Sequence, residues 1–383
     1  MALNSSGPIS IAGTTAGVSI QKELGGTGTA QMSLNCATVR TLAGVPSGAI
    51  IMPTNFYGKS SGPTVLSYTF AANTANASLN VASISGYVAG SSAITVTVNS
   101  GVYLYSTSNA TPGLTLTGGT TGDTVTLVNN GFIMGQGGVG GGYSVSSSAG
   151  GTALKLGFNT TVNNTNASAY IGGGGGGGGS KKASVCGGLN HGTGGGGGGA
   201  GGGGGGISCQ CYFNLGGGPI RPTAGTGGGV GSVGGSTSAD SNSAGDSFWA
   251  AASGSGGGRV FPGTGGVGSN SGNVGTIGTG GGAGGGGGST YATCCCAGSN
   301  YLIGQGGAGG ASNAVGGVGI GFSCTCYSGP AGGGGGGWGA SGGLGFGGTL
   351  IFAPGGGGKA VCLNGKTVTW VSGNTTRVYG AVS

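Results

Sequence analysis

Hydrophobic and polar residues alternate in short runs between residues 64 and 134. A period of two is typical of strands that bury one face. Turn sequences such as Asn99-Ser100-Gly101 and Asn129-Asn130-Gly131 separate the runs. Short strands at this spacing predict a β-domain over residues 64–134, built as a β-sandwich or a β-solenoid. Its alternating hydrophobic positions are Val65, Tyr68, Phe70, Leu79, Val81, Ile94, Val96, Val98, Val102, Leu104, Leu114, Leu116, Val125 and Leu127.

Residues 1–63 predict a small leader with one short helix. A partial apolar stripe runs through Ser33–Ala43 and predicts a helix there. Ser33 or Asn35 can cap this helix, and Gly44 ends it. Val18–Ile20 is interpreted as a short strand. A segment of this size has too little core to be very stable alone, so we expect it to dock on a partner or on the next domain.

Residues 135–348 are rich in glycine and lack the alternating hydrophobic pattern. Glycine supplies 110 of the 383 residues, without the Gly-X-Y period of collagen. Disorder is one interpretation of such a composition, but only 4% of residues are charged, whereas disordered chains are usually charged and polar. In the ordered alternative, glycine segments adopt the polyproline II conformation and bond to one another on several sides, because no Cβ intervenes. We therefore predict a polyglycine II helix bundle over residues 135–348, with loops between its segments.

The hydrophobic pattern returns at residues 349–383. The runs Lys359–Leu363 and Lys366–Val371 flank Asn364-Gly365, which is a strong hairpin signal. We expect a C-terminal β-meander that closes the chain. The predicted fold class is thus all-β plus a polyglycine II bundle.

Eight of the ten cysteines lie in the glycine-rich region. The pattern glycine, apolar residue, Ser-Cys-x-Cys-Tyr occurs twice, at 206–212 and 321–327, and a third loop carries three consecutive cysteines. Disulfides between loops would stabilise the bundle by roughly 2–4 kcal/mol each, and the alternatives are a zinc site or free thiols. The disulfide candidates are Cys186, Cys209, Cys211, Cys294, Cys295, Cys296, Cys324 and Cys326.

Charge and catalytic chemistry are sparse. The net charge is +7, from 11 basic and four acidic residues that are scattered along the chain, which argues against a nucleic-acid interface. We expect no membrane insertion, signal peptide, metal or cofactor. A nucleophile pair of Cys186 and His191 would lack a residue that orients the histidine. Asp240 and Asp246 could form a catalytic carboxylate pair, but only within one serine-rich loop. We predict that the protein is not an enzyme.

Several stretches resemble known phage proteins. Ser6–Ser10, Ser33–Val45 and Phe56–Lys59 resemble the leader of many glycine-rich bacteriophage tail proteins, and Asn129–Gly138 is similar to the strand-to-glycine junction of tail fibres. The glycine blocks with variable loops resemble the tip adhesin of T-even-like phages. That resemblance implies a polyglycine II sandwich whose loops bind a receptor on the host surface.

The same resemblance implies partners and a location. The leader would attach to other virion tail or baseplate proteins, and the loops would bind a host outer-surface protein or glycan. The protein would belong to the tail of the virion and be extracellular after lysis, either as a homotrimer or as a single chain. Candidate receptor-binding residues, which packing at the edge of the bundle would explain equally well, are Lys181, Lys182, His191, Tyr212, Phe213, Phe248, Trp249, Tyr291, Tyr301 and Tyr327.

Trp338 lies inside a glycine block, and we expect it to be a buried wedge rather than a contact residue. Two other functions fit the composition. One is a self-assembling glycine-rich filament or sheath subunit that binds no receptor. The other is an ice-binding protein, against which the long irregular loops argue.

Overall fold

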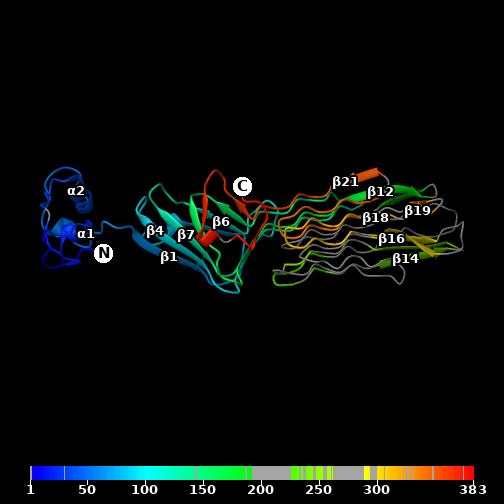
Figure 1. The fold of residues 1–383 in the computed structure, drawn as a ribbon, viewed down its shortest axis with the longest axis horizontal. Helices are drawn as coiled ribbons and strands as arrows, with labels where there is room; N and C mark the ends of the chain where they lie inside the picture. Colours follow the sequence, from blue (N-terminus) through cyan, green and yellow to red (C-terminus); the bar gives the residue numbers. More distant parts are fainter. Residues whose placement is uncertain are drawn as a thin grey trace. The chain divides into compact units, whose positions relative to one another are not determined.

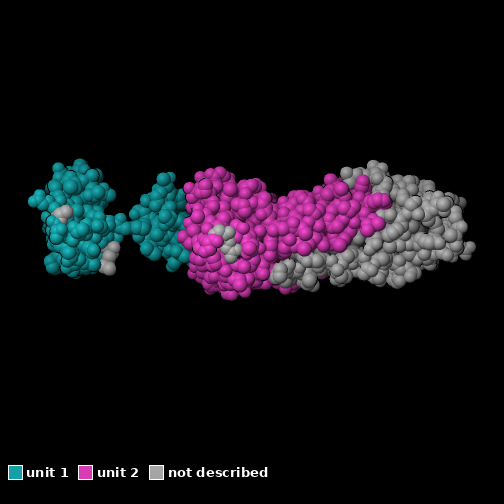
Figure 2. Space-filling view, in the orientation of Figure 1, with its two compact units in different colours: residues 1–68, 81–95, 119–125 teal, residues 69–80, 96–118, 126–383 magenta. Residues whose placement is uncertain are grey.

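A computed structural model describes most of the chain. Only backbone pairing is described for the strands within 182–191, 239–252, 289–305, 321–328 and 349–351. The described residues form two compact units: residues 1–68, 81–95 and 119–125 belong to unit 1, and residues 69–80, 96–118 and 126–383 to unit 2 (Figure 2). The residues described are 2–29, 31–142, 145–185, 188–191, 226–232, 234–235, 239–244, 247–252, 257–259, 261, 289–293, 300–305, 307–321, 323–324, 327–328, 331–346, 349–373 and 375–383.

The leader of unit 1 contains two helices rather than the single one expected. Helix α1 spans Ile20–Glu23 and includes the last residue of the strand predicted at Val18–Ile20, of which Ser19 forms only an isolated parallel bridge with Ser10. The Ser19 side chain accepts the N–H of Lys22 and caps the helical turn. Helix α2 spans Ala37–Ala43. It begins later than predicted, after Cys36 and without a side-chain cap, and it ends as predicted at Gly44, whose φ of 71° is left-handed. A 3-10 helix, η1, follows at Thr54–Phe56.

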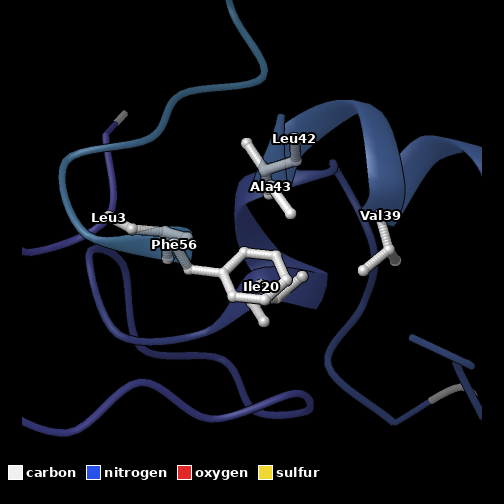
Figure 3. Packing of buried hydrophobic residues seen from close by; sticks show 6 residues of the cluster. All are labelled: Leu3, Ile20, Val39, Leu42, Ala43 and Phe56. Atoms are coloured by element: carbon white, nitrogen blue, oxygen red, sulfur yellow. The ribbon is translucent and has the colours of Figure 1, made fainter. Parts of the chain in front are cut away.

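A small apolar core holds the leader together. Phe56 and Ile20 are fully buried at its centre, and Val39 and Leu42 of α2 close it. Figure 3 shows the Phe56 ring beside Ile20, with Leu42 next to Ala43 on the helix above them. The partial stripe that predicted the helix is therefore the face that α2 buries.

Asp123 joins two stretches of unit 1, residues 81–95 and its own stretch, 119–125. Its carboxylate accepts hydrogen bonds from the Tyr87 hydroxyl at 2.7 Å, from the Thr120 N–H at 2.8 Å and from the Ser92 N–H at 3.0 Å. Burial by itself raises the pKa of Asp123, but the hydrogen bonds together outweigh it and hold the pKa below its ordinary value of 3.8.

Acid is expected to weaken this connection. Because the folded pKa lies below the unfolded one, the stabilisation by ionised Asp123 is complete above the unfolded pKa of about 3.9 and is lost as the pH falls through the folded pKa. Melting temperatures of the wild type and of Asp123→Asn, measured from about pH 7 to about pH 3, should converge as the pH falls. A constant difference across this range would contradict the prediction.

The β-rich part of the described chain is built from three sheets, in which strands pair in parallel. Successive strands enter the sheets in turn, so that neighbours within a sheet are mostly three strands apart in the sequence. The sheet orders are β1-β4-β7-β10-β23, β2-β5-β8-β11-β24 and β22-β9-β6-β3. Their bounds are β1 Thr64–Phe70, β2 Thr74–Ala75, β3 Ala77–Asn80, β4 Ser92–Val98, β5 Tyr103–Tyr105, β6 Leu114–Thr117, β7 Thr124–Asn129, β8 Phe132–Met134, β9 Leu154–Leu156, β10 Thr160–Asn163, β11 Tyr170–Gly172, β22 Val361–Cys362, β23 Val368–Trp370 and β24 Val378–Tyr379. The 3-10 helices η2 and η3 span Val81–Ser83 and Val371–Gly373.

Parallel register explains the alternation seen in the sequence. Leu104, Ile133 and Ile171 lie opposite one another on β5, β8 and β11, and all three are fully buried. Leu114 and Leu154 are paired in the same way on β6 and β9. Each row of buried side chains thus continues from strand to strand. The described part of the chain is mostly β with few helices, as predicted.

The C-terminal strands do not form the predicted meander. Asn364-Gly365 does make a turn, with φ values of 50° and 74°, and the N–H of Lys366 bonds to the carbonyl of Leu363. However, the strands on either side, β22 and β23, belong to different sheets and pair in parallel with β9 and β10. The reason is that β9 and β10 offer free hydrogen-bonding edges in two different sheets. β22 pairs with one edge and β23 with the other, so the two strands do not pair with each other.

The glycine-rich residues leave the sheets at equivalent points. The stretch 135–153 follows β8, and the longer stretch 173–360 follows β11, which is the neighbour of β8 in its sheet. Strands β9–β11 lie between the two stretches, so residues 154–172 belong to the sheets although the sequence pattern placed them in the glycine-rich region. Figure 1 shows the glycine-rich segments of unit 2 running side by side.

Hydrogen bonds connect these segments at every third residue. In the first pair of segments, the N–H groups donate at 2.9, 2.7 and 2.8 Å. Gly172–Gly179 is buried throughout and also bonds to residues within 148–151, 333–343 and 355–358. A Cβ on Gly174 or Gly177 would collide with a backbone carbonyl, which explains why this central segment is glycine. The donors of the first pair are Gly135, Gly138 and Gly141, and the acceptors are Gly172, Gly175 and Gly178.

Candidate functional site

Antiparallel strands extend from the ends of the glycine segments. Strand β12 (Ser180–Val185) continues directly from Gly172–Gly179, and β21 (Thr349–Phe352) leads into 353–358. With β13 (Gly188–His191) they form a sheet in the order β13-β12-β21. The hydrogen bond from the Gly355 N–H to the Gly177 carbonyl joins the two supporting segments, so the scaffold fixes where β12 and β21 meet.

A second antiparallel sheet has the order β14-β15-β16-β17-β18. Strand β17 runs into the glycine-rich segment that begins at residue 307, and β18 follows the segment 314–319. A third, two-stranded sheet is formed by β19 and β20. The bounds are β14 Ala239–Ala244, β15 Ser247–Ala252, β16 Ser289–Thr293, β17 Asn300–Gln305, β18 Ile320–Gly321, β19 Ser323–Cys324 and β20 Tyr327–Ser328.

Several candidate residues meet in the register of these sheets. Trp249 on β15 pairs with Ala292 on β16, and Ala292 pairs with Tyr301 on β17, so one row crosses three strands. In the next row, Tyr291 pairs with Ala250 and Leu302. Residues from three separate parts of the sequence are therefore brought together. No sequence pattern gives this register.

Other candidates lie on neighbouring strands. Lys182 on β12 pairs with His191 on β13. Phe248 pairs with Ser243 across the hairpin of β14 and β15. Tyr327 lies on β20, which is beside both β12 and β17. Strand β20, which carries Tyr327, therefore adjoins both the sheet of Lys182 and His191 and the sheet of Tyr301.

The remaining predictions have different outcomes. Lys181 pairs with Leu350 and is half-buried, and its stem lies close to Gly345. Tyr212 and Phe213 lie outside the described residues, as do all the disulfide candidates except Cys324, which is on β19 but whose side chain is not described. Among described side chains the cysteines are Cys36 and Cys362, and both are free thiols. Disulfide pairing stays a prediction.

An aromatic cluster at the base of the glycine segments was missed by the sequence interpretation. Tyr103 stacks on Phe132 at 4.5 Å between ring centroids, and Tyr170 stacks on Phe261 at 5.1 Å. Phe261 in turn stacks on Trp338 at 4.0 Å. The signal was present in part, since Tyr103, Phe132 and Tyr170 occupy equivalent positions of β5, β8 and β11.

Trp338 is fully buried in this cluster, which confirms that it is a wedge and not a contact residue. Arg259 adds a cationic contact nearby. Its guanidinium lies 5.1 Å from the centre of the Tyr105 ring and donates a hydrogen bond of 2.9 Å to Gln136 Oε1. Burial lowers the pKa of Arg259 from its ordinary value. This cluster connects the sheets to the glycine segments within unit 2.

Two features of the described part of the chain bear on the kind of site. No group of three or more His, Cys, Asp or Glu residues within it is arranged to hold a metal ion. No helix within it has the length and apolar character that crossing a bilayer requires. The described geometry is that of a hydrogen-bonded scaffold that carries short antiparallel sheets.

Comparison with protein families gave one match. Residues 65–279, more than half of the chain, match the family model described as phage tail fibre adhesin Gp38. Comparison with curated proteins and with solved structures gave no match.

Proposed function

This chain belongs to the phage tail fibre adhesin Gp38 family, and we propose that it recognises a host-cell surface receptor through the strands and loops carried by its glycine-rich segments. Membership of the family places the protein in the tail of the virion and gives it a structural role. The observation that carries the proposal is the scaffold itself: buried, bonded glycine segments lead directly into strands that bear the candidate residues.

We propose that these segments form a polyglycine II bundle. A chain in this conformation has three residues per turn and no internal hydrogen bonds, so its N–H groups point in three directions in succession. The contacts of Gly172–Gly179 fit that description, because Gly176 and Gly179 donate to the segment 340–343, whereas Gly174 and Gly177 donate to the segment 148–151. A rigid bundle would hold the loops in place and reduce the entropy lost on binding.

The other parts of the chain then have supporting roles. The three parallel sheets fit a β-solenoid, which would be the spacer that begins in residues 64–134 and that the strands of 361–379 complete. The leader, residues 1–63, would attach to other tail or baseplate proteins. In this assignment, residues 135–348 supply the bundle and its loops, while the partner on the host is a surface protein or a glycan.

Aromatic residues on the antiparallel sheets are the proposed contacts. Trp and Tyr dominate binding energy at protein interfaces, since they bury a large area at low entropic cost. Trp249 and Tyr301 share a row of the β14–β18 sheet with Ala292, and Tyr291 lies in the row beside them. The pair Lys182 and His191 adds polar positions on the neighbouring sheet.

Replacement of Trp249 or Tyr301 by alanine is expected to weaken adhesion. Loss of an aromatic anchor typically costs about 2 kcal/mol or more, which corresponds to roughly a thirtyfold weaker dissociation constant. The measurement is binding of fluorescently labelled purified protein to intact cells of a bacterial panel that includes the phage's host. Tyr68→Ala is the matched control, because Tyr68 is an exposed aromatic on β1, a strand that belongs to neither of these sheets.

Folding must be followed in the same variants, by circular dichroism and thermal melting. Unchanged adhesion of both folded variants would refute the assignment of these two residues. Failure of the wild-type protein to bind any strain that the phage infects would refute the proposed function as a whole.

A further inference from the structure

An open hollow lies along the exposed face of α2 in the leader. The opposite face of this helix packs Val39, Leu42 and Ala43 into the apolar core (Figure 3). The hollow has a volume of about 590 Å³. Binding clefts typically measure about 300–1,000 Å³, so there is room for a short stretch of peptide. The residues that line the hollow are Asn35, Ala37, Arg40, Thr41, Gly44 and Pro46.

Arg40 supplies a fixed positive charge at the hollow. Its Nε donates to Asn35 Oδ1 at 2.8 Å, and its Nη1 donates to the carbonyls of Val45 and Gly48 at 3.2 and 3.1 Å. A guanidinium carries five N–H donors, and the two on Nη2 take part in none of these bonds. The side chain of Arg40 is therefore held in place by its neighbours without being saturated by them.

Further hydrogen-bond donors border the hollow. Because Asn35 Oδ1 accepts the bond from Arg40, the other polar atom of the Asn35 side chain is the Nδ2 donor. The ammonium group of Lys59 lies beside Gly44, where a Cβ on the glycine would be 3.4 Å from Nζ. The hollow thus offers donors and positive charge, and it fits a group that brings acceptors and negative charge.

The leader itself supplies no carboxylate for Arg40. Residues 1–63 contain three basic residues and one acidic residue, Glu23. Glu23 is only 8% exposed, and its carboxylate accepts the Ser60 hydroxyl at 3.0 Å and the Ser61 N–H at 2.9 Å. This carboxylate therefore holds the end of the leader. A negative charge that complements Arg40 has to come from outside residues 1–63.

We propose that the hollow binds an acidic segment of the tail or baseplate protein to which the leader attaches, with an Asp or Glu carboxylate on Arg40. This inference rests on the attachment role proposed above for the leader. Hydrogen bonds between a guanidinium and a carboxylate are charge-assisted and stronger than neutral ones, and Lys59 beside Gly44 adds a second positive charge. A nucleic acid is a poorer occupant, because three scattered basic residues do not form the basic patch that binds a phosphate backbone.

Attachment to virions that lack this chain tests the proposal. The virions come from a phage in which the gene for this chain is deleted. They are mixed with purified full-length protein and collected by centrifugation, and the bound protein is measured. Ala37→Glu places a carboxylate at the hollow three residues before Arg40, on the same side of α2. This variant is expected to attach at least about tenfold more weakly, because its own carboxylate pairs with Arg40 and repels the incoming one.

Two matched variants separate charge from bulk and from position on the helix. Ala37→Gln has nearly the shape of Ala37→Glu without the charge, and it should attach much more tightly than Ala37→Glu. Thr38→Glu adds the same charge at the next exposed residue, which does not line the hollow, and it should attach like the wild type. Circular dichroism and thermal melting follow the folding of each variant. Added salt should weaken attachment of the wild type by screening the charges.

Equal attachment of Ala37→Glu and the wild type overturns the inference, as does an equal loss in Ala37→Gln or a wild type that is insensitive to salt. Duplex DNA that binds the wild type but not Ala37→Glu would assign the hollow to nucleic acid and would also overturn it. Failure of the wild type to attach to these virions refutes the proposed role of the leader, and this inference with it. All variants should bind host cells like the wild type, so receptor recognition is tested independently.

Discussion

Replacement of Trp338 by alanine is expected to lower the free energy of unfolding of unit 2 by about 3–5 kcal/mol. Trp338 is fully buried among Phe261, Met134 and neighbouring aromatic residues, and its ring lies 4.0 Å from that of Phe261. The surrounding glycine segments carry no side chains that could fill the cavity. The lost contacts would therefore not be recovered by relaxation, which places the effect toward the upper end of this range.

Native-state hydrogen exchange is the appropriate measurement, because a chain with two compact units need not unfold in one step. Amides of residues 173–179 and 331–337 should lose protection in Trp338→Ala, while those of the leader should not change. Trp370→Ala, at a half-buried position of β23, is the matched control and should have a smaller effect on these amides. Equal protection in the wild type and Trp338→Ala would show that the wedge contributes nothing to the scaffold.

The second large effect is expected at Gly177. Its N–H donates to the Ser148 carbonyl and its own carbonyl accepts the N–H of Gly355, while a Cβ would lie inside the contact distance of the Val139 carbonyl. Alanine at this position must push one segment away and break hydrogen bonds. Overpacking typically costs about 1–3 kcal/mol, and each lost bond adds about 1 kcal/mol.

Gly356 supplies a control that differs only in its surroundings. It lies in the same group of segments, but a Cβ there would meet no atom within 4 Å and its φ is not positive. Gly356→Ala should be neutral or more stable by about 0.4–1 kcal/mol, because alanine restricts the unfolded chain. Exchange rates of the Gly174 and Gly358 amides, which bond across these segments, report the difference. If both substitutions had the same effect, close approach of the segments would not be the reason for glycine at residue 177.

The sequence predicted those features of the fold that depend on a local pattern or on a single residue type. Alternation identified Leu104, Leu114 and Leu127 as buried strand positions, because a parallel register preserves the period of two from strand to strand. Trp338 could be recognised as a wedge, since a large apolar ring within a glycine block has no other side chain to shield it. Gly44 ended α2 because its left-handed conformation suits glycine.

Pairing between distant strands was not predictable in the same way. Asn364-Gly365 specifies a turn but not a partner, and the strands on its two sides pair with β9 and β10, about 200 residues earlier in the chain. The row that joins Trp249 to Tyr301 depends on the registers of β15, β16 and β17, which are set by segments on either side of them. Phe261 was overlooked because the sequence around it has no periodicity, and only the fold shows that it covers Tyr170.

The placement of β22, β23 and β24 on the edges of β9, β10 and β11 sets the order of events during synthesis. A nascent chain completes β11 long before β22, β23 and β24 are synthesised. During that time the sheets hold the glycine-rich residues at one end only. Contacts of such large sequence separation make folding slow. We therefore expect the sheet edges at β9, β10 and β11 to stay open to proteases and to other chains until residues 361–379 have been synthesised.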